Sequence, residues 1–232
     1  MQRRLAAPIL TRVLGRSLLS LALAIAVALA GCGSETDGDR TGSERPRTAT
    51  ERPSAATERL VERLRRGGFV LAFRHAATDL TTTDMTGDPR DCSRQRNLNL
   101  KGRRQAREIG RSFRQLGIPV GRVFASPFCR TRDTARLAFG RVRQAGALLS
   151  AEFFTDERAV ARQRNRFRDL LTEPPRGDTN TVLVSHNFAI DDATGVSLAE
   201  GEAVVLVPGR GRRGFEIAGR IDAAEWSRLA AG

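Results

Sequence analysis

Three short runs of almost uninterrupted apolar residues constrain the fold of this 232-residue chain more than any other feature. The runs are Gly68–Phe73, Val120–Ala125 and Thr181–Ser185. A strand that is apolar at nearly every position predicts burial on both faces, which is typical of a parallel sheet covered by helices. Amphipathic helical patterns precede or separate these runs, at Thr57–Arg66, Lys101–Leu116, Thr131–Phe139 and Asp156–Leu171.

The alternation of strands and helices predicts the α/β class, as a three-layer α/β/α sandwich around a mostly parallel sheet. Two further strands, Ala203–Val207 and Phe215–Ile221, are joined through Pro and Gly residues and predict an antiparallel pair. A short terminal helix should follow, with Trp226 and Leu229 on its apolar face. Because 40% of the residues are apolar, the chain can bury a core, and wholesale disorder is excluded.

Polar residues stand where each apolar run ends: Arg74-His75, Ser126-Pro127 and Ser185-His186. The carboxyl ends of parallel strands meet at one edge of the sheet, where ligands bind in folds of this class. The only two histidines of the chain should therefore lie at the same rim. A guanidinium at the end of a buried strand costs free energy unless it is paired. Arg74 thus indicates an oxyanion as the ligand of this rim.

Four segments together resemble the histidine phosphatase superfamily, whose fold is also called phosphoglycerate mutase-like. FRHAATD is similar to the Arg-His-Gly motif of that family, with Ala76 in the third place. LNLKGRRQAREIG is similar to the helix that follows, VFASPFCRTRDTA to the segment with the second arginine, and TVLVSHN to the strand that delivers the second histidine. The resemblance extends from about Thr57 to Ile221, and the exported context makes the chain look more like a small envelope phosphatase than a mutase.

The resemblance implies a metal-independent hydrolase of phosphomonoesters that needs no cofactor. His75 would attack phosphorus and form a phosphohistidine, which water would then hydrolyse. One of its ring nitrogens should donate to an acceptor, we expect a backbone carbonyl, to fix the tautomer. Arg74 and Arg130 would offer forked donors to the phosphoryl oxygens, and His186 would supply a further donor. The substrate is expected to be a small phosphorylated molecule.

The proton donor for the leaving group is the least determined residue. Glu157 is the first choice by position, because it opens a helix that should face the same rim. The alternatives are Asp156, Asp191 and Glu202. Asn187 stands at the position where the acid-phosphatase branch of the superfamily has an Asp as proton donor. The resemblance therefore does not imply a proton donor at this position. The segment from Thr78 to Asn97 is expected to shape the substrate entrance, and Ser126 to cap the helix with Arg130.

The first 31 residues predict a lipoprotein signal peptide, with a basic start and an apolar run from Leu18 to Ala30. That run is too short to span a membrane as a helix. Leu29-Ala30-Gly31-Cys32 resembles the lipobox of bacterial lipoproteins, which implies lipidation of Cys32; a plain signal peptide is the alternative. Residues 32–55 then form a polar, disordered tether, and residues 56–232 the histidine phosphatase domain. The expected location is the cell envelope, outside the cytoplasm, with the lipid anchored in the membrane.

Two further cysteines, Cys92 and Cys129, suggest a disulfide, because thiols exposed to an oxidising compartment pair readily. Two separate buried thiols remain the alternative. The 39 basic against 26 acidic residues give a net charge of +13, spread along the whole chain. Without a basic stripe that contains aromatic residues, this charge does not indicate nucleic acid as a partner. We expect a monomer.

Three other functions remain open at this stage. A non-catalytic lipoprotein that binds a phosphorylated ligand would keep the same pocket without a proton donor. A phosphomutase would use the same residues, but its metabolites are cytosolic, which disagrees with export. An electrostatic binder of lipid or nucleic acid is the most remote alternative.

Overall fold

The computed structural model describes residues 52–84, 88–154 and 156–232. In the first half, the elements are α1 (Ala55–Leu64), β1 (Val70–Arg74), the 3-10 helix η1 (Cys92–Arg94), α2 (Leu100–Gln115), β2 (Val120–Ala125) and α3 (Cys129–Phe139). In the second half, they are β3 (Arg143–Gln144), the 3-10 helices η2 (Gly146–Leu148) and η3 (Ala151–Phe153), α4 (Glu157–Thr172), β4 (Asn180–Ser185), α5 (Asn187–Thr194), β5 (Ala203–Pro208), β6 (Phe215–Ile221) and α6 (Ala223–Ala231).

The strands of the described part form one six-stranded sheet in the order β3-β2-β4-β1-β5-β6. The pairs β1/β4, β2/β4 and β2/β3 are parallel, whereas β1/β5 and β5/β6 are antiparallel. The predicted mostly parallel sheet with an antiparallel edge is therefore confirmed. Because β1 and β4 lie at the centre, their carboxyl ends are flanked by strands on both sides.

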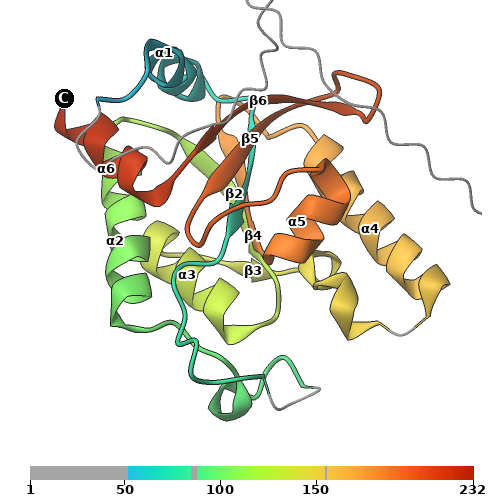
Figure 1. Cartoon of the computed structure of the whole chain (residues 1–232). Coiled ribbons are helices and arrows are strands. Elements are labelled where there is room, and N and C mark those ends of the chain that lie inside the picture. The colour runs from blue at the N-terminus through green and yellow to red at the C-terminus, as the bar shows by residue number, and fades with distance from the viewer. Residues whose placement is uncertain (1–51, 85–87, 155) are drawn as a thin grey trace, which may run out of the picture. The chain divides into compact units, whose positions relative to one another are not determined.

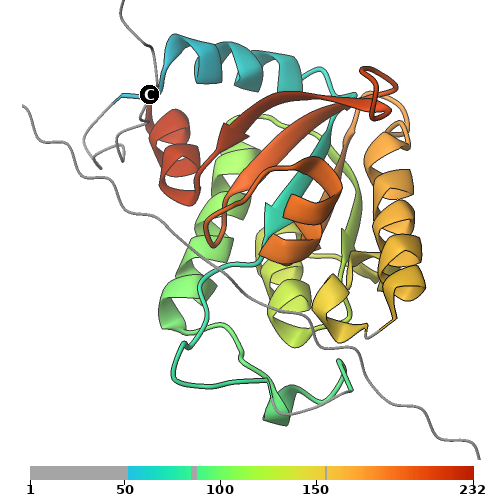
Figure 2. The ribbon, with the colours of Figure 1, turned by 45° about the vertical axis from the view of Figure 1, so that its right-hand side comes forward.

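Helices cover both faces of this sheet (Figures 1 and 2). One apolar core joins α1, α2, α3 and α6 to one face, through residues such as Ile109 and Trp226, and includes Leu71 and Phe73 of β1. The other core joins α4 and α5 to the opposite face, and includes Val70 and Ala72 of β1. Successive residues of β1 thus enter different cores, which explains why this strand is apolar throughout.

Side-chain caps define where several helices begin. Ser54 Oγ accepts a hydrogen bond from Thr57 N (3.1 Å), and Asn99 Oδ1 accepts one from Gly102 N (2.8 Å). The first helix accordingly begins at Ala55, before the predicted domain boundary at residue 56, and Ser54 belongs to the folded domain. The predicted signal peptide, Cys32 and the tether up to residue 51 lie outside the described residues. Both apolar cores are formed by residues from Leu60 onwards.

Two glycines of α2 allow neighbouring backbone segments to approach this helix closely. A Cβ atom on Gly102 would lie 1.9 Å from the Ala77 carbonyl oxygen, and one on Gly110 would lie 2.0 Å from that of Ala138. Any side chain at these positions would therefore displace the segment after β1 or helix α3.

Five elements have no counterpart in the sequence prediction. Helix α5 directly follows His186, in a stretch for which no element was predicted, and the two-residue strand β3 extends the sheet beyond β2. The 3-10 helices were also not predicted, because three residues are too few to show a helical period. Within the described ranges, no helix has both the length and the apolar character needed to cross a membrane.

Candidate active site

The register of the central strands brings the two histidines together. In the parallel pair β1/β4, Arg74 lies opposite Ser185, so the next residues, His75 and His186, leave the sheet side by side. Their ring centroids are 5.8 Å apart, and the rings meet edge to face. Their exposed fractions are 2% and 4%. The structure confirms that both histidines lie at one rim.

His75 is held as a neutral imidazole with a free ring nitrogen. Its Nδ1 lies 2.9 Å from the Ala76 carbonyl oxygen, which can only accept, so Nδ1 carries the proton and Nε2 keeps its lone pair. Burial, together with the nearby charges of Arg130 and Arg74, lowers the pKa of His75 to about 3. The predicted bond to a backbone carbonyl is present, and Nε2 can act as a nucleophile at neutral pH.

His186 adopts the opposite tautomer. Arg130 Nη2 donates to its Nδ1 (3.3 Å), and its Nε2 donates to Ser126 Oγ (2.9 Å). Burial and then the charge of Arg130 lower the pKa of His186 well below its ordinary value. Ser126 therefore orients an imidazole. Its predicted role as a helix cap is wrong, because α3 begins after Phe128 without a side-chain cap.

Arg130 projects from the first turn of α3 and is almost fully buried. Its Nη1 donates to Asp84 Oδ1 (3.0 Å), and its guanidinium lies over the ring of Phe128 at 4.6 Å. The same carboxylate oxygen accepts from Arg96 N (2.9 Å). Asp84 thus occupies the donors that the phosphoryl oxygens of a substrate would use.

Arg74, the last residue of β1, directly precedes His75. Its Nη1 donates to the Leu198 carbonyl oxygen (2.9 Å), and its Nη2 lies 4.0 Å from Glu200 Oε1. Glu200 Oε1 also accepts from Thr78 N (3.2 Å) and Thr78 Oγ1 (2.7 Å). This carboxylate joins the arginine to the segment that follows His75.

A third arginine, Arg96, belongs to the same cluster. Burial is the main cause of the lowered pKa values of Arg74, His75, Arg130 and His186, and the positive charge of Arg96 lowers each of them further. The Nε–H groups of all three arginines are buried and have no acceptor within the described ranges. The cluster therefore retains unused donors for an anion.

The carboxylates proposed from the sequence have other positions or other partners. Glu157 is exposed at the start of α4, and no described contact joins it to the histidines or arginines. Asp156 caps that helix through bonds to Arg158 N and Ala159 N, and Asp191 is exposed on α5. Glu202 is buried, and its Oε1 lies 2.7 Å from Arg220 Nη2.

Glu152 is the carboxylate that sequence reasoning missed. It lies in η3, and although burial lowers the pKa of Arg130, the negative charge of Glu152 opposes that shift. The next residue, Phe153, has its ring centroid 6.4 Å from that of His186. Glu152 is itself exposed, but its charge acts on Arg130, whereas no described interaction links Glu157 to the histidines or to Arg130.

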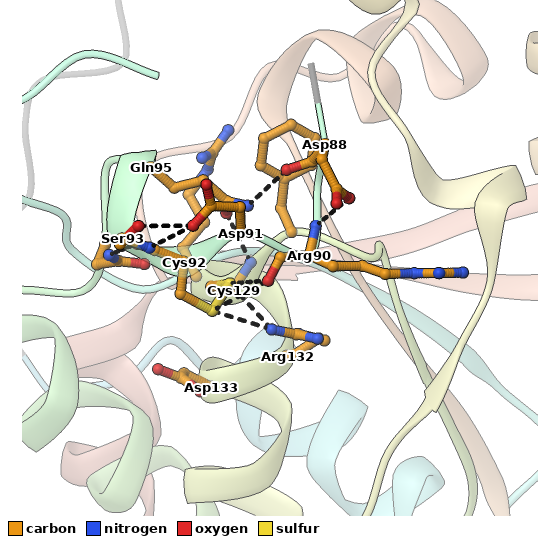
Figure 3. The surroundings of a disulfide bond; sticks show 12 residues. Asp88, Arg90, Asp91, Cys92, Ser93, Gln95, Cys129, Arg132 and Asp133 are labelled. Carbon is orange, nitrogen blue, oxygen red and sulfur yellow. Dashed lines mark hydrogen bonds between the residues drawn. A yellow bond between two sulfur atoms is a disulfide. The ribbon is translucent and has the colours of Figure 1, made fainter. Parts of the chain in front are cut away.

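A disulfide fixes the entrance segment to the helix that carries Arg130 (Figure 3). Cys92 and Cys129 are bonded, with their Cα atoms 5.6 Å apart and a sequence separation of 37, which confirms the predicted bridge. Gln95 Oε1 accepts from Cys129 N (2.9 Å), which adds a second link. The bridge lies one residue before Arg130. It thereby restricts the segment that supplies Arg96.

The described ranges contain no group of three or more His, Cys, Asp and Glu side chains that could hold a metal ion. The site is instead composed of two neutral imidazoles and three guanidiniums, with carboxylates at its edge.

Residues 69–148 match the family model of the histidine phosphatase superfamily (branch 1). The matched segment extends from the residue before β1 to the end of η2 and includes Arg74, His75 and Arg130.

Several solved structures are similar to the chain. The protein histidine phosphatase SixA complexed with tungstate has 14% identity and a TM-score of 0.47, over 67% of this chain and 97% of that chain. A phosphoserine phosphatase mutant from Entamoeba histolytica in complex with phosphoserine has 13% identity and a TM-score of 0.47, over 68% and 98%. TTHB049 from Thermus thermophilus has 19% identity and a TM-score of 0.45, over 66% and 99%. No curated protein matches the sequence.

Proposed function

We propose that the chain is a phosphatase that hydrolyses phosphomonoesters through a phosphohistidine on His75. The observation that carries this proposal is the protonation state of His75. Its Nδ1 proton is committed to Ala76, and its Nε2 lone pair lies among buried guanidiniums. A neutral nucleophile avoids repulsion by a phosphate dianion, and the cationic surroundings attract that dianion. The match of residues 69–148 to the histidine phosphatase family model supports the same activity.

The first step transfers the phosphoryl group to the enzyme. Nε2 of His75 forms a bond to phosphorus while the bond between phosphorus and the ester oxygen breaks. Arg130 and Arg74 stabilise the charge that spreads over the phosphoryl oxygens in the transition state. For this, the phosphate must displace the Asp84 carboxylate from Arg130 Nη1 and compete with His186 for Nη2. His186 then gains a negative neighbour, which raises its pKa and makes it a better donor.

Glu152 supplies the proton that the departing ester oxygen needs. In the second step, the same residue accepts a proton from water while the water oxygen attacks phosphorus and the bond to Nε2 breaks. The products are an alcohol and inorganic phosphate, and His75 returns to its neutral state. No step in this sequence requires a metal ion.

Activity of the fragment 47–232 towards an aryl phosphate tests the proposal, because this fragment retains Ser54 and both cores. We expect turnover in the presence of a chelator, and acid quenching with labelled substrate should trap a phosphoenzyme. His75→Ala should abolish both signals. Turnover by that variant would refute the mechanism.

The role of Glu152 is tested by comparing leaving groups. Glu152→Gln should slow hydrolysis of an alkyl phosphate by about 100-fold, whereas an aryl phosphate, whose leaving group needs less protonation, should be affected far less. Glu157→Gln is the matched control and should leave both rates unchanged. Equal losses for the two variants would remove Glu152 as the donor.

We also propose that the enzyme is a lipoprotein outside the cytoplasm, anchored through Cys32. The signal-like first 31 residues support this location, and the Cys92–Cys129 disulfide is consistent with an oxidising compartment. Expression of the full chain and of Cys32→Ser, followed by separation of membrane and soluble fractions, tests the anchor. Equal membrane association of both proteins would contradict it.

A further inference from the structure

Most of the large apolar side chains that are exposed in the described residues lie on segments at the active-site end of the sheet. Five such residues are exposed in the described ranges: Leu80, Leu100, Phe153, Phe188 and Ile217. The first four belong to segments at the carboxyl ends of the parallel strands. Leu80 follows β1, Leu100 begins α2, Phe153 precedes α4, and Phe188 follows β4. Clusters of exposed apolar residues indicate a binding surface more often than scattered ones do.

Two of these residues, Phe153 and Phe188, belong to segments next to His186. The Phe153 ring stacks on Phe128 with centroids 4.6 Å apart, and Phe128 meets the His186 ring edge to face at 5.3 Å. Phe188 lies two residues after His186 on α5, is 66% exposed, and belongs to a helix that contacts η3. We call the two exposed rings, Phe153 and Phe188, the aromatic wall; the buried ring of Phe128 supports Phe153 and joins it to His186. A phosphate alone is too small to cover the aromatic wall.

The outer face of α2 carries a row of cations that we call the α2 basic stripe. Its members recur every three or four residues and are all exposed: Lys101, Arg104, Arg107, Arg111 and Arg114. None of them forms an ion pair with another described residue. Helix α4 is also rich in arginine, but Arg162 pairs with Asp156 and Arg164 with Asp192. The stripe begins directly after the exposed Leu100, at the active-site end of the molecule.

We propose that the substrate is an amphiphilic phosphomonoester, a phosphate carried on an apolar chain and presented at an anionic membrane surface. This inference rests on the phosphatase activity proposed above. The aromatic wall contacts the apolar chain next to the phosphate, while Arg74 and Arg130 bind the phosphate itself. The α2 basic stripe attracts the anionic headgroups of the surrounding lipids, which hold the active-site end near the membrane.

A pair of substrates that share one ester separates this proposal from general phosphatase activity. Phosphatidate in phosphatidylcholine vesicles and soluble glycerol 3-phosphate carry the same phosphate ester, but only phosphatidate has acyl chains. The fragment 47–232 should hydrolyse phosphatidate with a kcat/KM at least about tenfold higher, since covering one large apolar side chain contributes that much or more. An aryl phosphate serves as the test of turnover itself.

Two exposed apolar residues supply a matched pair of variants. Phe188→Ser should lower kcat/KM for phosphatidate by about tenfold and leave glycerol 3-phosphate unaffected. Ile217→Ser, which removes an exposed apolar side chain from β6, should change neither. Equal activity of the unaltered fragment towards both phosphates would overturn the substrate class. Absence of turnover with all three substrates would instead refute the phosphatase proposal.

Sedimentation with vesicles of phosphatidylcholine and phosphatidylglycerol tests whether the α2 basic stripe binds an anionic membrane surface. Reversing Arg104, Arg107 and Arg111 to Glu should reduce vesicle binding at low salt by more than about tenfold, because each cation near such a surface contributes appreciably. The control reverses three exposed arginines of α4 and so makes the same change in net charge: Arg158, Arg162 and Arg166. Equal losses of vesicle binding in the two variants would overturn the membrane role of the α2 basic stripe. Binding to DNA that depends on the stripe, without binding to vesicles, would overturn it as well.

Discussion

Acidification from about pH 7 to about pH 5 should destabilise the folded domain through the active-site histidines. The chain contains two histidines, and both are buried as neutral imidazoles. Burial is the main cause of the lowered pKa of each, to about 3 for His75 and well below the ordinary value for His186. Unfolding returns both side chains to water, where they bind protons readily.

The sign and size of the effect follow from these shifts. At any pH between about 3 and an ordinary histidine pKa of about 6.5, the unfolded chain binds a proton that folded His75 excludes. The free energy of unfolding therefore falls as the pH falls through this window. At about pH 5, roughly 1.5 units below 6.5, His75 alone accounts for a loss of about 2 kcal/mol. His186 acts in the same direction and increases the loss.

Urea unfolding of the fragment 47–232 measures this difference. The chain has one tryptophan, Trp226, which is fully buried and reports unfolding by its fluorescence. A variant with His75→Asn and His186→Asn has no imidazole, so its stability should change much less between the two pH values. Equal stability of the unaltered fragment at both pH values, or an undiminished pH effect in the double variant, would refute the reasoning.

Three further predictions concern the entrance and the phosphate donors. Asp84→Asn should tighten inhibition by inorganic phosphate about tenfold, because it removes from Arg130 a competing charged partner worth roughly 1.5 kcal/mol. Asp79→Asn is the control. Weaker inhibition of the Asp84 variant would contradict competition between Asp84 and phosphate. Replacing Cys92 and Cys129 by Ser should lower the free energy of unfolding in urea by about 4 kcal/mol on the chain-entropy model, and an unchanged value would show that the bridge does not stabilise the fold. Arg130→Lys should lower kcat/KM at least about 100-fold with an unchanged circular dichroism spectrum, since an ammonium cannot replace two forked donors; near-normal activity would exclude this arginine from phosphate binding.

The central part of the fold and site could be predicted because their signals are local. Strands buried on both faces are apolar at nearly every position, and the polar residues that end them are conspicuous against such runs. His75 and His186 could therefore be placed at one rim before their register was known. The bounds of β2 and β6 agree with the predicted ranges because both strands lie between turn-forming residues.

Other site residues gave no such signal. Asp84 and Arg96 belong to a segment without helical or strand periodicity, and only the folded chain brings them to Arg130. Glu152 lies in a three-residue 3-10 helix, whereas the predicted Glu157 opens a helix with a clear period. Sequence position favoured the more regular element, whereas the electrostatic effect of Glu152 on Arg130 depends on how the chain turns before α4.

The alignment of β1 with β4 makes the chemistry of this enzyme sensitive to chain length within those strands. Deletion of a single residue from either strand would turn every later side chain of that strand towards the opposite layer. One imidazole would then point away from the other, even though all the reactive residues were still encoded. We therefore expect related sequences to differ freely in the number of residues between these strands, while the residues that lead into each histidine stay constant in number.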